Sequence, residues 1–226
     1  MQPVLEISTP EGFALWPVAE VKPYSFLPLS GQLSPAEVGT ALMRLADCND
    51  IDPSPEDDDR RPRPADPLGS FLHGLLTLDN LFAAGGLRVT DGSTGISFLP
   101  GCCTGLEDWR DWHEVLDGSG SASFGHDPDP LAERLGDTIR LTVDVEQSDS
   151  PVIEVPVTEL RHLLSDAERD LISFVALTAD WAARHLPDHA ASVTSAVARA
   201  LALSSSAVPS KPYGDVLWST GGRSSA

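Results

Sequence analysis

"TIRLTVDVEQSDSPVIEVPVTELRHLL", residues 138–164, contains the change of pattern that decides the fold class. Apolar and polar residues alternate in "TIRLTVDV" and again in "VIEVPV", which predicts two β-strands joined by the polar turn "EQSDSP". After Thr158 the apolar residues recur with helical spacing instead. Strands followed by helices predict an α+β fold: a central antiparallel sheet of about four or more strands packed against helices, with a helical C-terminal third.

The helical third divides into several predicted segments. "ELRHLL" forms the first, and Ser165 with Glu168 three residues later predicts a capping box that begins a second helix. Pro187 interrupts that helix. The segment "DHAASVTSAVARALAL" predicts a final helix before residues 204–226, which are rich in Ser and Gly and predict a loosely ordered tail.

More strands are expected upstream. "LRVT" and "ISFLP" flank the turn "DGSTG", and an Asp-Gly pair tolerates the backbone angles of a tight turn, so the segment predicts a β-hairpin. Residues 1–32 carry five prolines among short apolar runs. Proline removes a backbone donor, so this region is expected to form an edge strand or an extended arm.

Two helices are predicted between these strand regions. In "SPAEVGTALMRLA", Ser34 is the expected N-cap, Pro35 the first helical residue and Glu37 the partner in a capping box. Residues 68–84 are apolar around most of a helix surface and precede Gly85-Gly86, a stop signal, so they predict the central buried helix.

The domain organisation follows from composition. Residues 47–67 combine prolines, eight acids and three arginines with no apolar periodicity, which predicts an exposed acidic loop in which Arg60, Arg61 and Arg63 neutralise nearby aspartates. Residues 1–203 are expected to form a single domain around this loop.

A formal net charge of −19 constrains the partners. Such a charge repels phosphate backbones and anionic lipids, so no nucleic acid and no membrane partner is expected, whereas a basic protein partner is favoured. The sequence has no long apolar span and no signal peptide, and its three cysteines make a disulfide framework improbable, so the protein is predicted to be cytoplasmic.

The stretch "FLPGCCTGLEDWRDWHEV", residues 98–115, is the candidate binding segment. Thr104 and Glu107 predict a capping box and a helix over residues 105–116. Residues 104–137 hold nine acids against two arginines. The expected binding residues on this helix are Glu107, Asp108, Asp111 and Glu114, with Trp109 and Trp112 in the core or at the interface.

The same stretch offers an alternative metal or thiol site. Thiol, imidazole and carboxylate groups are ligands for zinc, and a helix N-terminus can lower a thiol pKa. The spacing is irregular for a zinc motif, so simple packing of these polar residues stays open. The candidate zinc ligands are Cys102, Cys103, His113, His126 and Asp127.

"FLPGCCTGLEDWRDW", with "FGHDPDP" downstream, resembles a family of uncharacterised actinobacterial proteins without assigned activity, over roughly residues 70–185. That resemblance implies lineage rather than mechanism. In acidity, size and its Trp-containing central segment the chain is also similar to bacterial toxin-immunity proteins, which implies an inhibitor of another protein.

These observations favour an acidic, non-catalytic protein-binding module without a cofactor, such as an immunity protein or another inhibitor of a basic partner. The sequence has no P-loop, dinucleotide-binding, nucleophile-elbow or HExxH motif. The first alternative is a metal- or thiol-dependent enzyme centred on Cys102, Cys103, His113 and His126. The second is a structural subunit of an assembly, which predicts an exposed apolar face on the helix over residues 68–84.

Overall fold

The described part of the chain forms two four-stranded sheets and five α-helices. The computed structural model describes residues 1–51, 62–117 and 120–203. The strands are β1 (Gln2–Ile7), β2 (Ser25–Pro28), β3 (Gly85–Thr90), β4 (Ser97–Phe98), β5 (Ser121–Ser123), β6 (Leu131–Leu135), β7 (Thr138–Thr142) and β8 (Val152–Pro156). The helices are α1 (Pro35–Cys48), α2 (Pro67–Thr77), α3 (Trp112–Asp117), α4 (Val157–His185) and α5 (Ala190–Ala200), with 3₁₀ turns η1 (Leu106–Asp111) and η2 (Pro187–His189).

The predicted α+β class and the helical C-terminal third are confirmed. All strand pairs are antiparallel, in the orders β2-β1-β3-β4 and β5-β6-β7-β8. The predicted mid-chain strands therefore divide between two sheets: the β3–β4 hairpin belongs to the first and the β7–β8 pair to the second. The short strands β5 and β6 complete the second sheet and were not predicted.

Strand β1 occupies an inner position of the first sheet, which corrects the expected edge strand or arm. It pairs with β2 on one side and with β3 on the other. Val4, Leu5 and Ile7 are completely buried. Pro3 has no N–H to donate, but its carbonyl oxygen still accepts a hydrogen bond from the Leu29 N–H.

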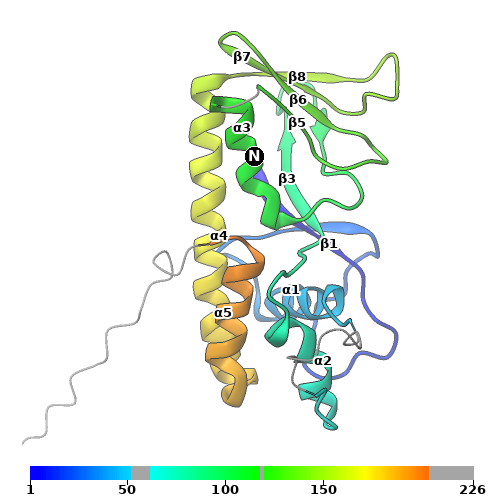
Figure 1. The fold of residues 1–226 in the computed structure, drawn as a ribbon, viewed down its shortest axis with the longest axis vertical. Coiled ribbons are helices and arrows are strands. Elements are labelled where there is room, and N and C mark those ends of the chain that lie inside the picture. The colour runs from blue at the N-terminus through cyan, green and yellow to red at the C-terminus, as the bar shows by residue number, and fades with distance from the viewer. Residues whose placement is uncertain (52–61, 118–119, 204–226) are drawn as a thin grey trace, which may run out of the picture.

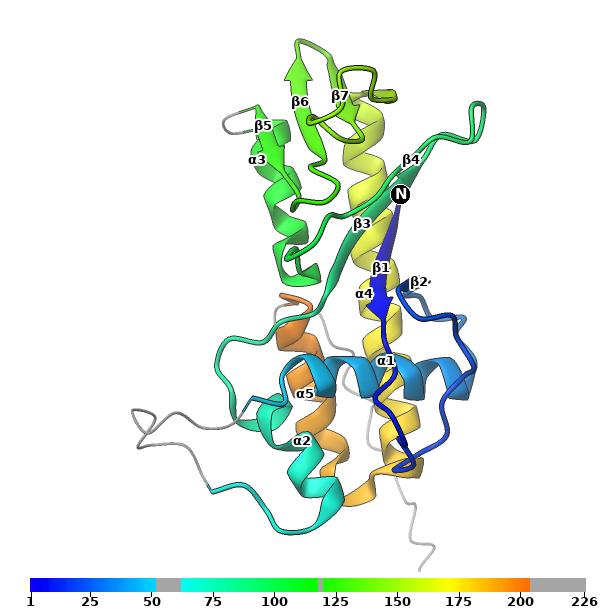
Figure 2. The ribbon, with the colours of Figure 1, turned by 90° about the vertical axis from the view of Figure 1, so that its right-hand side faces the viewer.

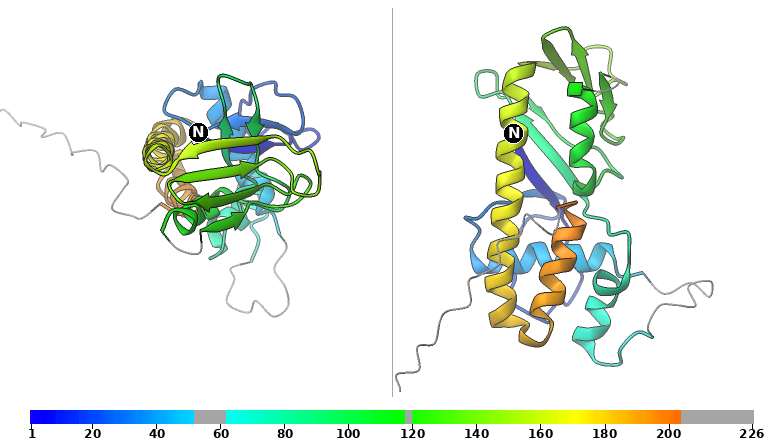
Figure 3. Two further views of the ribbon diagram at one scale, coloured as in Figure 1. Left: turned by 90° about the horizontal axis from the view of Figure 1, so that it is seen from above. Right: turned by 60° about the vertical axis from the view of Figure 1, so that its left-hand side comes forward.

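Helix α4 connects the two ends of the molecule (Figures 1 and 3). Its 29 residues span about 44 Å at 1.5 Å per residue, and it contacts β1, β7, β8, α1, α3 and α5. The predicted break at Ser165 is wrong. Ser165 lies inside the helix and its hydroxyl donates to the Arg161 carbonyl four residues earlier, so it caps nothing.

The end of the molecule opposite the second sheet is helical (Figure 2). Helix α1 begins as predicted, with a complete capping box between Ser34 and Glu37. Helix α2 ends at Thr77 and not near residue 84. Gly85 and Gly86 begin β3 and do not terminate a helix: Gly85 has φ +148°, and an added Cβ would lie 2.1 Å from the Val4 carbonyl oxygen.

The predicted acidic loop over residues 47–67 is shorter than expected at both ends, because α1 extends to Cys48 and α2 begins at Pro67. Residues 52–61, including Arg60 and Arg61, lie outside the described residues, as does the predicted tail over 204–226. Arg63 pairs with Asp50 at 2.5 Å.

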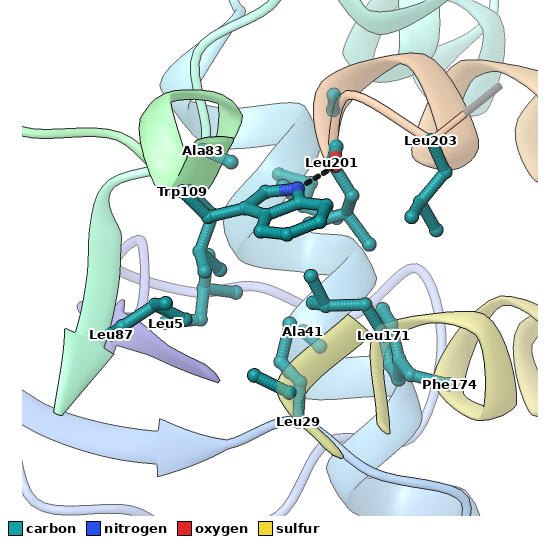
Figure 4. Close-up of a cluster of buried hydrophobic side chains, with 14 of the residues drawn as sticks. Leu5, Leu29, Ala41, Ala83, Leu87, Trp109, Leu171, Phe174, Leu201 and Leu203 are labelled. Atoms are coloured by element: carbon teal, nitrogen blue, oxygen red, sulfur yellow. Dashed lines mark hydrogen bonds between the residues drawn. The ribbon is translucent and has the colours of Figure 1, made fainter. Parts of the chain in front are cut away.

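The main core lies where the first sheet meets α1, α4 and the end of α5. Figure 4 shows Trp109 at its centre, surrounded by side chains from β1, β3, α1 and α4. The Trp109 indole N–H donates to the Leu201 carbonyl at 3.0 Å. This bond ties the candidate binding segment to the C-terminal end of α5.

Candidate functional site

The candidate segment begins with a 3₁₀ turn, η1, which passes directly into the short helix α3. The predicted capping box at its start is wrong: Gly105 is the N-cap and no side chain caps the turn. The Glu107 carboxylate instead accepts a hydrogen bond from the Ala83 N–H at 3.0 Å. The backbone N–H of Ala83, from a distant segment, therefore takes the place of the Thr104 N–H that a capping box would offer to Glu107.

Glu107 therefore holds the 78–84 connection against η1. Its side chain is half-buried, and this burial raises the pKa of its carboxyl above the usual range. Ala83, which donates to it, is completely buried. The structure thus places this predicted binding residue in a structural contact.

We expect Glu107→Ala to lower the free energy of unfolding by about 1–3 kcal/mol, because it leaves a buried N–H without its acceptor. Glu107→Gln keeps an acceptor oxygen and removes the charge. Because the folded pKa is raised, the ionised carboxylate disfavours folding as the pH rises from the unfolded value through the folded one. The stability of the glutamine variant, measured by urea denaturation, should therefore decline less above pH 4.5 than that of the wild type. Equal effects of the alanine and glutamine variants on stability would contradict this role.

The binding role predicted for Trp109 and Trp112 does not fit the structure. Their side chains are 2% and 1% exposed. Trp112 stacks on Phe124 with ring centroids 4.4 Å apart. Both tryptophans are core residues, which is one of the two positions expected from the sequence.

The three remaining acids of the segment form an exposed cluster, called here the acidic ridge: Asp108, Asp111 and Glu114. Partial desolvation, followed by the charges of the other two acids, raises the pKa of Asp111. Among the described residues none of the three forms an ion pair. Their negative charges therefore repel one another without a neighbouring cation.

Six other acids in the described ranges form ion pairs with arginine. Arg110, which lies within the ridge segment, is directed away from it: its side chain lies over the Trp109 ring and contacts Glu168 at 3.6 Å. The other paired acids are Asp47 with Arg44, Asp50 with Arg63, Asp117 with Arg161, Glu154 with Arg140, and Asp166 with Arg169. The ridge is therefore an uncompensated part of the acidic surface.

A second candidate site lies immediately before η1. Cys102, Cys103 and His126 are all exposed, and one potential ligand atom from each lies within 4.8 Å of the others. The two sulfur atoms are 3.5 Å apart. The structure thus brings together three of the five predicted metal ligands.

Two glycines allow the loops that carry these residues to approach each other. A Cβ at Gly101 would lie 2.3 Å from the Pro128 carbonyl oxygen, and one at Gly125 would lie 2.6 Å from the Cys102 carbonyl oxygen. Gly125 also has φ +106°. Sequence reasoning missed both positions, although each glycine directly precedes a candidate ligand, in "GC" and "GH".

The other two predicted ligands do not join the group. His113 lies on α3 with its ring edge against Trp109, at a centroid distance of 6.1 Å. The Asp127 carboxylate is 3.8 Å from the His126 Nδ1, beside the group but outside it. Of the predicted set, the structure therefore brings together Cys102, Cys103 and His126, with Asp127 beside them and His113 held elsewhere.

At Cys102 the thiol pKa is raised, which is the opposite of the lowering that a helix N-terminus would cause. The neighbouring Cys103 thiol raises the pKa of Cys102, and partial desolvation acts in the same direction. A raised pKa leaves less thiolate at neutral pH, so a nucleophilic role for Cys102 lacks the activation it requires.

Comparisons with known proteins identify no relative: no family model, curated protein or solved structure matches the chain. Within the described ranges, no helix combines the length and apolar character needed to cross a bilayer. Helix α2 was also expected to expose an apolar face in a structural subunit. Its apolar side chains are buried or half-buried.

Proposed function

We propose that this protein is an acidic, non-catalytic binding module that engages a basic protein partner through the acidic ridge, as an inhibitor or an immunity protein does. The observation that carries the proposal is the exposed, unpaired state of Asp108, Asp111 and Glu114 on a segment whose opposite face is anchored in the core. We further propose a cytoplasmic location, because the three cysteines are free thiols.

A rigid acidic surface suits the recognition of a basic partner. Complementary charges accelerate diffusional encounter and exclude wrong partners, more than they set the final affinity. The Trp109 indole fixes η1 to α5, so the ridge carboxylates are carried on a backbone that is already ordered. The mutual repulsion of the three acids would be relieved when a cationic side chain binds between them.

The first measurement is the native mass of the tagged protein isolated gently from its own cells, which identifies a retained partner. The proposal predicts a basic protein in the complex. The association rate of the two purified proteins is then measured as a function of salt, because screening at 1 M reduces the Debye length to about 3 Å. An association rate that does not change with salt would exclude steering by charge.

For the ridge itself, we expect the triple variant Asp108→Asn, Asp111→Asn, Glu114→Gln to reduce the association rate roughly tenfold at low salt, and the difference to vanish at 1 M salt. The matched control neutralises three exposed acids elsewhere: Glu146→Gln, Asp149→Asn and Asp188→Asn. It makes the same change in net charge. Equal rates for the two triple variants would show that the partner does not dock on the ridge.

A further inference from the structure

We propose that Cys102, Cys103 and His126 form a zinc-binding site, a property that is independent of the proposed protein-binding function. Two thiols and an imidazole are the donor types that borderline and soft cations prefer, and zinc sites commonly combine them. Three protein ligands leave one coordination position for water or for the adjacent Asp127 carboxylate.

The distances are close to those of a closed site. Two thiolates bound to one Zn²⁺ at about 2.3 Å in a tetrahedron hold their sulfur atoms about 3.8 Å apart. The Cys102 and Cys103 sulfurs are already 3.5 Å apart. The imidazole atom lies within 4.8 Å of both sulfurs, and all three side chains are exposed, so rotation of these side chains can bring the donors closer.

The backbone holds the two ligand loops in place. Cys102 and His126 form an isolated antiparallel bridge, in which the Cys102 N–H donates to the His126 carbonyl at 2.6 Å and the His126 N–H to the Cys102 carbonyl at 3.2 Å. The Gly101 N–H donates to the Phe124 carbonyl at 2.8 Å. A site whose loops are fixed before the metal binds loses little conformational freedom on binding it.

Two residues of these loops have a left-handed backbone conformation. Of the four non-glycine residues with positive φ in the described part of the chain, two belong here: Cys103 at 63° and Asp127 at 50°. Such conformations persist where the surroundings enforce them, and they gather at functional sites. The positive φ of Cys103 accompanies the orientation of its sulfur toward that of Cys102.

The electrostatic surroundings favour a cation. Asp127 and Asp129 follow His126 on the same loop, and the chain carries a formal net charge of −19. A strongly negative surface raises the local concentration of cations. The Asp127 carboxylate beside the His126 ring, at 3.8 Å from Nδ1, can orient the imidazole or provide the fourth ligand.

Cobalt(II) is the probe for the test, since it takes tetrahedral sites like those of zinc and its thiolate bonds produce a charge-transfer absorption band in the near ultraviolet. The full chain, kept reduced by a phosphine under anaerobic conditions, is titrated with Co²⁺ and then with Zn²⁺. We expect one equivalent of Co²⁺ to generate the band and Zn²⁺ to abolish it. A titration that gives no band overturns the site.

Variants assign the ligands. Cys102→Ser, Cys103→Ser and His126→Gln should each weaken Co²⁺ binding at least tenfold, and far-UV circular dichroism checks that they remain folded. The matched controls are Cys48→Ala, which removes the third cysteine, and His113→Gln, which removes the histidine held against Trp109. Both controls should bind Co²⁺ like the wild type. Loss of the band in a control, or its retention in all three ligand variants, contradicts the assignment.

Discussion

Replacing Trp109 with alanine is expected to lower the free energy of unfolding by about 3–5 kcal/mol, the range for removing a buried aromatic side chain from a core. The indole lies in a cluster of buried side chains from β1, β3, α1, α4 and the end of α5, so its loss opens a cavity where five elements meet (Figure 4). These elements cannot all close around the cavity at once. The Leu201 carbonyl also loses its indole donor.

Urea denaturation followed by far-UV circular dichroism measures this effect, since the chain has five tryptophans and their fluorescence would mix several environments. Trp109→Phe should cost less than the alanine variant, because the smaller ring still fills most of the space, although the indole hydrogen bond is lost. Tyr24→Ala is the control for an exposed aromatic, with an expected change within about 0.5 kcal/mol. A change below about 1 kcal/mol for Trp109→Ala would show that this part of the core is loosely packed.

The capping boxes show how far local sequence determines the fold. A Ser or Thr followed three residues later by Glu led to the prediction of a capping box at Ser34, Thr104 and Ser165, and of these three residues only Ser34 caps a helix. At Thr104, tertiary packing offers the glutamate a buried donor from another segment. At Ser165, the helix had already begun at Val157, where the chain leaves β8. A local motif predicts a helix start where no distant partner and no preceding helix competes for its groups.

The candidate sites show the same division between local and distant information. The exposure of Asp111 and Glu114 and the burial of Trp109 and Trp112 follow from their positions on different faces of a helical segment. The pairing of Cys102 with His126 joins loops that are 24 positions apart and depends on a bridge that no periodicity encodes. His113 is nearer to the cysteines in sequence, but α3 turns it toward Trp109. Proximity in sequence therefore does not determine which histidine lies beside the cysteines.

The second large effect is expected at Gly74, in the middle of α2. The structure places an added Cβ there 1.7 Å from the Asn49 carbonyl oxygen and 2.7 Å from its carbonyl carbon, both backbone atoms. Asn49 is itself fixed: its side chain is buried, donates to the Leu45 and Phe82 carbonyls and accepts from the Phe82 N–H. Neither side of the contact can yield, so α1 and α2 would have to separate.

Helix propensity and packing make opposite predictions for Gly74→Ala, which makes the substitution decisive. In an exposed helix alanine is favoured over glycine by about 1 kcal/mol. Here we expect a loss of about 3 kcal/mol in urea denaturation, at the upper end of the cost of overpacking a core. Gly92→Ala is the control, because nothing lies within 4 Å of its added Cβ, and it should change stability by no more than about 0.5 kcal/mol. A gain in stability for Gly74→Ala would mean that α2 rests on α1 more loosely than these distances require; a loss would establish that glycine is retained in this helix for the close approach of Asn49, against its own propensity.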